Sequence, residues 1–316
     1  MSIKTLNNEI QHLVLKDETK LSFQSFGQDY LTTPVILVNH PLTGDSRVTG
    51  KFGWWKNLIG KGKTIDTEKY AVIAFNIPGN GFDGVMIEDY ESWNSGTIAC
   101  YFYEGLTQLG IKDLYAVIGG SIGAGIAWEM ASIYPKLIKH LIPVGGDWKS
   151  TDWMIANTFL QKQILSTHKN PLEIARMQAM LCYRTPKSFK LRFNRSINQK
   201  LQIFNVESWL THHAKKLTGR FELHAYKTMN HLLGSIDITR NGQSFEELIK
   251  IIESEIHIFS IDSDLFFPLE EDQETVSRAS AVGVKINHQI ISSDFGHDAF
   301  LMEPEKVVPL LYPIFN

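Results

Sequence analysis

The sequence predicts an α/β fold with a doubly wound, mostly parallel β-sheet. Short apolar, β-branched runs recur along the chain with helical stretches between them, a pattern typical of strands covered on both faces. After one of these runs, Ile122, Ile126, Met130 and Ile133 form a helical stripe that stops before Pro135. Such alternation of strands and helices is the signature of the α/β class. The candidate strands are residues 34–38, 70–75, 114–118, 141–144, 255–261 and 284–291.

The amino-acid composition of the sequence changes between Trp148 and about Asn241. This region is rich in Leu, Met, Gln, Lys and His, and helical stretches such as 153–165 and 172–182 dominate it. A helical block inserted between strands usually lies over their C-terminal ends as a lid. We therefore expect a core in two parts, residues 1–147 and 243–316, interrupted by a helical lid insertion over residues 148–242.

Composition excludes several classes of partner. The chain has 316 residues, of which 43% are hydrophobic. Its net charge of −3 gives no basic surface for binding nucleic acid. The polar N-terminus lacks a secretory signal, and no apolar run approaches the length of a membrane span. Only Cys100 and Cys182 occur, which suits a reducing compartment. We predict a cytoplasmic protein that binds neither nucleic acid nor membrane.

Residues 119–123, Gly-Gly-Ser-Ile-Gly, contain the strongest catalytic signal. They follow an apolar run and open a helical stretch, the strand–turn–helix order in which the serine of G-x-S-x-G becomes a nucleophile. Gly119 and Gly123 supply the small residues that such a tight turn needs on both sides of Ser121. The pattern predicts that Ser121 is a nucleophile.

A nucleophilic serine needs a base and a group that orients the base. In the α/β-hydrolase arrangement the acid and then the histidine follow the serine along the chain. Two acids follow the run 255–261, of which we favour Asp264 over Asp262. His297 lies in the loop after the last predicted strand. Ser121, Asp264 and His297 thus form a predicted catalytic triad.

An oxyanion should be bound by backbone amides near the serine. The loop after residues 34–38 and the residue after Ser121 supply candidate donors, the N–H groups of Leu42 and Ile122. In the same loop, His40 is interpreted as a structural histidine in preference to a base. The histidines of the helical region lack a convincing ligand set, so we predict no metal; these are His212, His213, His224 and His231.

Several longer motifs resemble one family. Residues 40–44 read His-Pro-Leu-Thr-Gly, residues 53–60 read Gly-Trp-Trp-Lys-Asn-Leu-Ile-Gly, and residues 296–301 read Gly-His-Asp-Ala-Phe-Leu. Together with residues 119–123, they resemble the H-A-L-T-G, G-W-W, G-H-D-A-F-L and G-G-S-x-G motifs of the homoserine O-acetyltransferases of methionine biosynthesis. The resemblance covers about residues 35–302.

The resemblance implies an α/β-hydrolase fold, a cytoplasmic homodimer formed through the helical lid, and acetyl-CoA as co-substrate without a bound cofactor. It assigns homoserine binding to Arg176, Tyr183 and Asp298. The chemistry agrees, because an arginine fork can bind a carboxylate with two bonds and a carboxylate suits an ammonium group. The spacing of Arg176 and Tyr183 allows both side chains to share one helix face.

Several departures leave alternatives open. Residues 150–162 differ from the family's pattern, the segment from there to Arg176 is shortened, and Ala124 replaces a glycine. The sequence therefore does not separate acetyl-CoA from succinyl-CoA, or homoserine from serine, or define the substrate tunnel. Two rivals from other classes are a plain esterase or thioesterase and a non-enzymatic binding protein. The G-x-G-x-x-G match at residues 79–84 lacks a following helix and is set aside.

Overall fold

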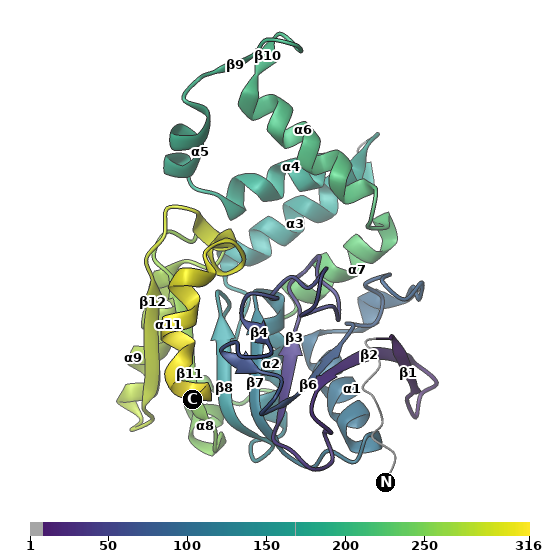
Figure 1. Ribbon diagram of the computed structural model, residues 1–316, viewed down its shortest axis with the longest axis vertical. Helices are drawn as coiled ribbons and strands as arrows, with labels where there is room; N and C mark the ends of the chain where they lie inside the picture. The colour runs from purple at the N-terminus through teal and green to yellow at the C-terminus, as the bar shows by residue number, and fades with distance from the viewer. Residues whose placement is uncertain (1–8, 168) are drawn as a thin grey trace.

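A computed structural model describes residues 9–167 and 169–316 and has an eight-stranded sheet at its centre (Figure 1). The strand order is β1-β2-β6-β3-β7-β8-β11-β12. The six strands from β6 to β12 are parallel, and β1 and β2 form an antiparallel edge. The predicted α/β class and mostly parallel sheet are confirmed. The strands are β1 (Gln11–Val14), β2 (Lys20–Gly27), β3 (Val35–Asn39), β6 (Ala71–Phe75), β7 (Leu114–Gly120), β8 (Ile138–Val144), β11 (Glu255–Ile261) and β12 (Ile286–Ile291).

Strand β2, which lies between β1 and β6, was missed by the sequence analysis. Its buried positions mix apolar Leu21 and Phe23 with polar Ser22, Gln24 and Ser25. A search for continuous apolar runs does not find such a strand, because half of its buried positions are polar. The Ser22 hydroxyl has a hydrogen-bond partner next to strand β6, because Asn76 Nδ2 donates to it at 2.9 Å.

Helices and loops cover the two faces of the sheet. One face is packed by α1 (Ser95–Gln108), α2 (Ile122–Ile133), α8 (Phe245–Ile251) and α9 (Leu269–Ala281). The other face is packed by α11 (Pro304–Phe315) and by the loop that carries β4 (Ile59–Gly60) and β5 (Ile65–Asp66). Figure 1 shows α11, in yellow, in front of β11 and β12.

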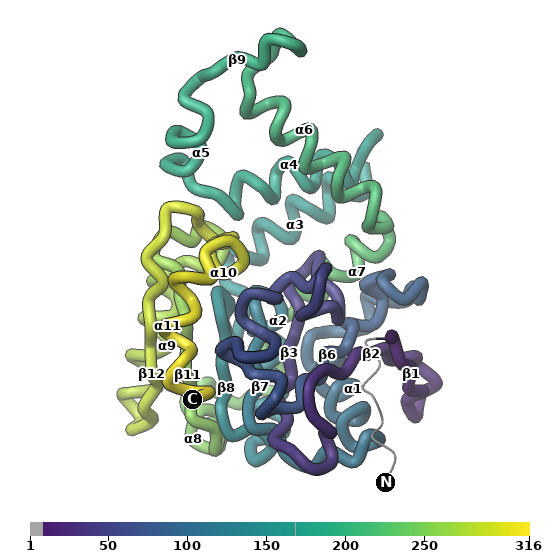
Figure 2. Tube along the Cα trace, viewed as in Figure 1, coloured from purple at the N-terminus to yellow at the C-terminus, as the bar shows by residue number. Residues whose placement is uncertain are grey.

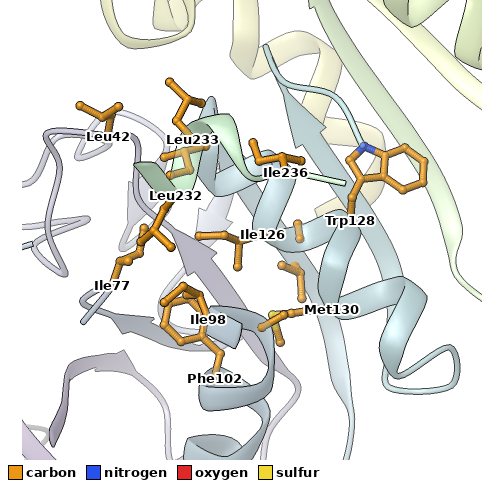
Figure 3. Packing of buried hydrophobic residues seen from close by; sticks show 14 of the residues in the cluster. Leu42, Ile77, Ile98, Phe102, Ile126, Trp128, Met130, Leu232, Leu233 and Ile236 are labelled. Atoms are coloured by element: carbon orange, nitrogen blue, oxygen red, sulfur yellow. The ribbon is translucent and has the colours of Figure 1, made fainter. Parts of the chain in front are cut away.

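Helix α2, which begins directly after Ser121, is buried on almost every side. The predicted apolar stripe is present, but its last residue, Ile133, is 38% exposed, while the residues from Ile122 to Ser132 are buried. The reason is that α2 lies between the sheet, α1 and the chain around Ile236 (Figure 3). A Cβ on Gly125 would lie 2.4 Å from Ile236, so this approach requires glycine. The helix behind the serine is therefore held rigidly.

The predicted helical region lies between β8 and α8 in the chain. It contains α3 (Asp152–Thr167), α4 (Pro171–Tyr183), α5 (Pro186–Phe193), α6 (Asn205–Thr218) and α7 (Leu223–Gly234), with a small hairpin of β9 (Ile197–Asn198) and β10 (Ile203–Phe204). Figures 1 and 2 show α3 to α6 beyond the end of the sheet at which β7 and β8 finish. The short elements η1 (Tyr90–Ser92), η2 (Gly296–Asp298) and α10 (Ala299–Met302) complete the fold. Among the described residues, no helix combines the length and the hydropathy needed to span a bilayer.

Two buried carboxylates lie on one face of the sheet near the end of β8. Asp147 Oδ1 accepts from the Trp148 amide at 2.7 Å, whereas its Oδ2 and the Oδ1 of Asp272 have no partner among the described residues. Burial raises the pKa of Asp147 to about 7, and burial together with the nearby Asp147 charge raises the pKa of Asp272. The folded protein therefore binds a proton at Asp147 more tightly than the unfolded chain.

This proton makes stability depend on pH. From about pH 4 to about pH 7 the free energy of unfolding should decrease as pH rises, by up to about 4 kcal/mol from Asp147. Asp147→Asn keeps an acceptor for Trp148 but does not titrate, so its decrease should be much smaller. Urea unfolding over this pH range measures the difference, with the exposed Asp113→Asn as control. Parallel curves for Asp147→Asn and wild type would contradict the assignment.

Candidate active site

Ser121 occupies a strained turn between β7 and α2. Its φ of 58° and ψ of −125° lie in a region that non-glycine residues rarely adopt, and such strain typically persists at functional sites. The flanking glycines are sterically required. A Cβ on Gly119 would lie 2.1 Å from the carbonyl oxygen of Gly123, and a Cβ on Gly123 would lie 2.4 Å from that of Asn39. The predicted nucleophile therefore has the backbone of a nucleophile elbow.

His297 is oriented by one of the two candidate acids. Its Nδ1 lies 2.7 Å from Oδ2 of Asp264, and both side chains are buried. The other oxygen of Asp264 accepts from the amides of Phe266 and Phe267 at 2.7 and 3.0 Å. Asp262 instead accepts from the Ser293 amide at 2.9 Å. With Nδ1–H donated to Asp264, Nε2 of His297 keeps a lone pair and can act as a base.

A turn at the end of β8 contacts the backbone of the serine and the ring of the histidine. Its two residues are Gly145 and Gly146. A Cβ on Gly146 would lie 2.5 Å from the carbonyl oxygen of Ser121, and one on Gly145 would lie 3.6 Å from Cε1 of His297. Ser121 therefore packs against Gly146 and His297 against the adjacent Gly145, and a side chain on Gly146 would push the elbow away.

The tryptophan pair of the sequence motif supports the histidine loop. Trp55 donates from Nε1 to the carbonyl oxygen of Phe300 at 3.1 Å. The Phe300 ring lies 5.5 Å from the His297 ring and fills the space beside Gly120, where a Cβ would be 2.5 Å from it. Trp54 is anchored separately, by a bond from Nε1 to the Asp45 carbonyl at 2.9 Å. Trp55 and Phe300 position His297 through packing.

The two predicted oxyanion donors have amides available for a ligand. Leu42 and Ile122 are buried, and within residues 9–167 and 169–316 neither amide donates a hydrogen bond. His40 holds the loop that carries Leu42. Its Nε2 accepts from the Ile77 amide at 3.0 Å, which places the proton on Nδ1, and Nδ1–H donates to Pro41 O at 2.8 Å. Burial lowers the pKa of His40, so it is a neutral structural residue.

The predicted homoserine-binding residues surround the histidine. The Tyr183 ring lies 5.6 Å from the His297 ring, and the guanidinium carbon of Arg176 lies 5.6 Å from the centre of the Tyr183 ring. Nε of Arg176 is buried and has no hydrogen-bond partner among the described residues. Asp298 Oδ2 accepts from Arg184 Nε at 2.8 Å. Arg176 therefore has unused donor capacity, whereas Asp298 already has one cationic partner.

Comparisons with known proteins agree with this geometry. The alpha/beta hydrolase fold family matches residues 34–304. A homoserine O-acetyltransferase of Symbiobacterium thermophilum is 32% identical over 85% of this chain and 81% of its own length. The chain belongs to the homoserine O-acetyltransferase family, within the α/β-hydrolase fold.

Solved structures support the fold of this family member. The homoserine O-acetyltransferase from Bacillus anthracis superposes with a TM-score of 0.84 at 18% identity, over 98% of this chain and 96% of that one. Esterase E22 reaches the same TM-score at 19% identity, over 98% of both chains. Because a transferase and an esterase fit the backbone equally well, the reaction must be inferred from side chains.

Arg184 is a charged site residue that the sequence analysis missed. It is buried, and it joins α4 to the histidine loop by its bond to Asp298. Its guanidinium lies 5.3 Å from the centre of the Phe295 ring. The sequence contained one clue, because Arg184 directly follows Tyr183, a residue already predicted to bind the substrate. No spacing rule connects it with a carboxylate 114 residues later.

A narrow cavity beside Leu42 and Tyr183 has a polar wall that the sequence analysis did not predict. Gln161 of α3 and Gln178 of α4 contribute this wall and are hydrogen-bonded to each other. Gln161 Nε2 also donates to the Ala175 carbonyl at 2.9 Å, but its Oε1 is buried and has no partner among the described residues. A ligand with a hydrogen-bond donor is complementary to this wall.

Proposed function

We propose that this enzyme transfers an acetyl group from acetyl-CoA to the side-chain hydroxyl of L-homoserine, through an acyl intermediate on Ser121. Membership in the homoserine O-acetyltransferase family supports this reaction, as does the arrangement of Ser121, His297 and Asp264. Three other residues are proposed to bind homoserine, namely Arg176, Tyr183 and Asp298.

The observation that carries the proposal is the free guanidinium of Arg176. Its buried Nε has no protein partner among the described residues. A substrate carboxylate satisfies both the charge and the donors. An ordinary esterase has no need of such a group, whereas an enzyme with an amino-acid acceptor does.

The first half of the reaction acylates the enzyme. Nε2 of His297 takes the proton of the Ser121 hydroxyl while Oγ attacks the thioester carbonyl. Amides of Leu42 and Ile122 bind the resulting oxyanion, and each such donor typically contributes about 3 kcal/mol to transition-state stabilisation. When the carbon–sulfur bond breaks, the imidazolium returns its proton to the leaving sulfur and free CoA departs. Asp264 stabilises the imidazolium throughout.

The second half transfers the acyl group to the amino acid. Arg176 binds the carboxylate of homoserine, and the remaining oxygen of Asp298 receives the ammonium group. His297 takes the proton of the homoserine hydroxyl, whose oxygen attacks the acyl carbon. The bond to Oγ then breaks, and Oγ regains the proton. Positioning of this hydroxyl can provide an effective molarity of about 10⁵ M or more, which favours it over water.

We propose that the helical region of residues 148–242 excludes water as a lid. Support comes from Tyr183, which lies on α4 of this region and next to His297. Burial raises the pKa of Tyr183 well above its usual range, which indicates a site withdrawn from solvent. We also propose that the enzyme is a cytoplasmic homodimer joined through this region, because α3 exposes Ile155, Phe159 and Leu160.

One experiment separates the candidate reactions. Purified enzyme is mixed with acetyl-CoA or succinyl-CoA and with homoserine, serine or water, and free thiol release is followed. We expect acetyl-CoA with homoserine to be fastest. Esterase or thioesterase activity is the second candidate, because the fold of esterase E22 matches equally well. Equal rates with water and homoserine would contradict the transferase proposal.

A further inference from the structure

Three side chains that can bind a metal converge at the end of the sheet opposite Ser121. Glu255 and His257 are two residues apart on β11, so they point to the same face of the sheet. His140 lies on the neighbouring parallel strand β8, where it is the direct partner of Glu255. The register of the sheet thus places two imidazoles and one carboxylate side by side.

The distances between their polar atoms fit a single metal ion. His140 Nδ1 lies 3.3 Å from His257 Nε2 and 3.3 Å from Glu255 Oε2, and the last two atoms are 3.7 Å apart. Ligand atoms arranged tetrahedrally around Zn²⁺ at their usual bond lengths lie about 3.3 Å from one another. We propose that His140, Glu255 and His257 form a binding site for Zn²⁺.

Hydrogen bonding between these groups is the rival explanation. The two imidazole nitrogens face each other, so one of them must carry a proton if no metal is bound. Both imidazoles are largely buried, with side chains 9% and 12% exposed, while Glu255 is 64% exposed. Burial lowers the pKa of both histidines, which favours the neutral form that binds metals. Zn²⁺ would use both nitrogen lone pairs and the carboxylate at once.

Asn287 supplies an outer contact to this site. It lies on β12 as the direct partner of His257, and its Nδ2 is 3.4 Å from His257 Nδ1. The amide oxygen and nitrogen of Asn exchange places by a simple rotation. With the oxygen turned inward, it accepts from Nδ1–H and leaves the Nε2 lone pair of His257 for the metal. Such outer contacts orient metal-binding histidines in many zinc proteins.

A cavity gives the proposed ion an entry path and a fourth position. It has a volume of about 530 Å³ and is lined by His140, Glu255, His257 and the end of α11 at Phe315. Lys139 also lines it, but its ammonium lies over the Tyr115 ring at 5.1 Å from the centre. Water or a small anion can therefore complete the coordination from the cavity.

The proposed zinc would not take part in acyl transfer. His140 lies five residues before Gly145, and Gly145 packs against His297. At the rise of an extended strand, these five residues span about 16 Å. The ion would instead join β8 to β11. We predicted no metal from the sequence, because His140 and His257 are 117 positions apart and form no short motif.

Titration of the untagged full-length protein with Zn²⁺ tests the proposal. After removal of metals with a chelator, calorimetry should show one equivalent bound. His257→Ala should weaken binding by about 100-fold or more, and Asn287→Ala by about 10- to 100-fold. His212→Ala, which removes an exposed histidine of α6, should bind Zn²⁺ like wild type. Co²⁺ should give the absorption spectrum of tetrahedral coordination in wild type and in His212→Ala but not in His257→Ala.

Two outcomes would overturn the zinc site. One is that wild type binds no Zn²⁺, and the other is that His257→Ala binds it with unchanged affinity and stoichiometry. Circular dichroism of each metal-free variant verifies folding, and Glu255→Gln offers a milder change if His257→Ala fails to fold. In thermal melts, Zn²⁺ should raise the Tm of wild type and leave that of the folded ligand variants unchanged.

Discussion

Ser121→Ala should reduce acyl transfer to homoserine by at least about 10³-fold. The hydroxyl is the proposed acyl carrier, and alanine leaves no atom that can form the ester. His297 and Asp264 are bonded to each other at 2.7 Å without the Ser121 hydroxyl, so the loss should report the nucleophile and not the base. Substrate binding should be retained, because the proposed contacts to homoserine come from other residues.

Intact-protein mass spectrometry provides the decisive measurement. Wild type mixed with acetyl-CoA alone should gain one acetyl group, and peptide mapping should place it on Ser121. Ser121→Ala should gain none, whereas Ser166→Ala, which changes an exposed serine of α3, should be acetylated like wild type. An acetyl group that persists in Ser121→Ala at unchanged rate would show that another residue carries it.

The sequence predicted the parts of the site that depend on local order. Residues 119–123 required a sharp turn because a strand and a helix flank them, and the structure gives Ser121 a φ of 58°. The position of His297 after the last strand also followed from chain order. Asp264 and Asp262 remained alternatives because both follow β11. Which of the two acids orients the histidine depends on contacts with distant segments, because the Ser293 amide donates to Asp262 and His297 donates to Asp264.

The parts that escaped prediction depend on pairing across the chain. Arg184 and Asp298 lie on separate segments, and only the packing of α4 against the histidine loop brings them together. Strand β2 escaped because buried small polar residues interrupt its apolar pattern. By contrast, the relation of Arg176 to Tyr183 was predictable, because both lie on α4 at a spacing that keeps them on one helix face.

Arg176→Met should raise the KM for homoserine by about 10- to 150-fold, the equivalent of about 1.5–3 kcal/mol for charge-assisted hydrogen bonds to a carboxylate. Methionine keeps much of the apolar stem that packs near Tyr183, so the change removes mainly the charge and the donors. Acylation of Ser121 precedes homoserine binding in the proposed mechanism. The first release of CoA should therefore keep its wild-type rate and amplitude.

Steady-state and single-turnover kinetics with acetyl-CoA separate these two effects. Arg192→Ala, which removes an exposed arginine of α5, serves as a control and should leave the KM for homoserine unchanged.

Arg176→Lys asks whether charge alone suffices. A lysine cannot bind a carboxylate with two parallel bonds, so its KM should lie between those of wild type and Arg176→Met. If Arg176→Met kept the wild-type KM while folding normally, the unpaired guanidinium would not be the carboxylate site. The preference for homoserine over water would then have to come from another group, for which the polar wall of Gln161 and Gln178 is a candidate.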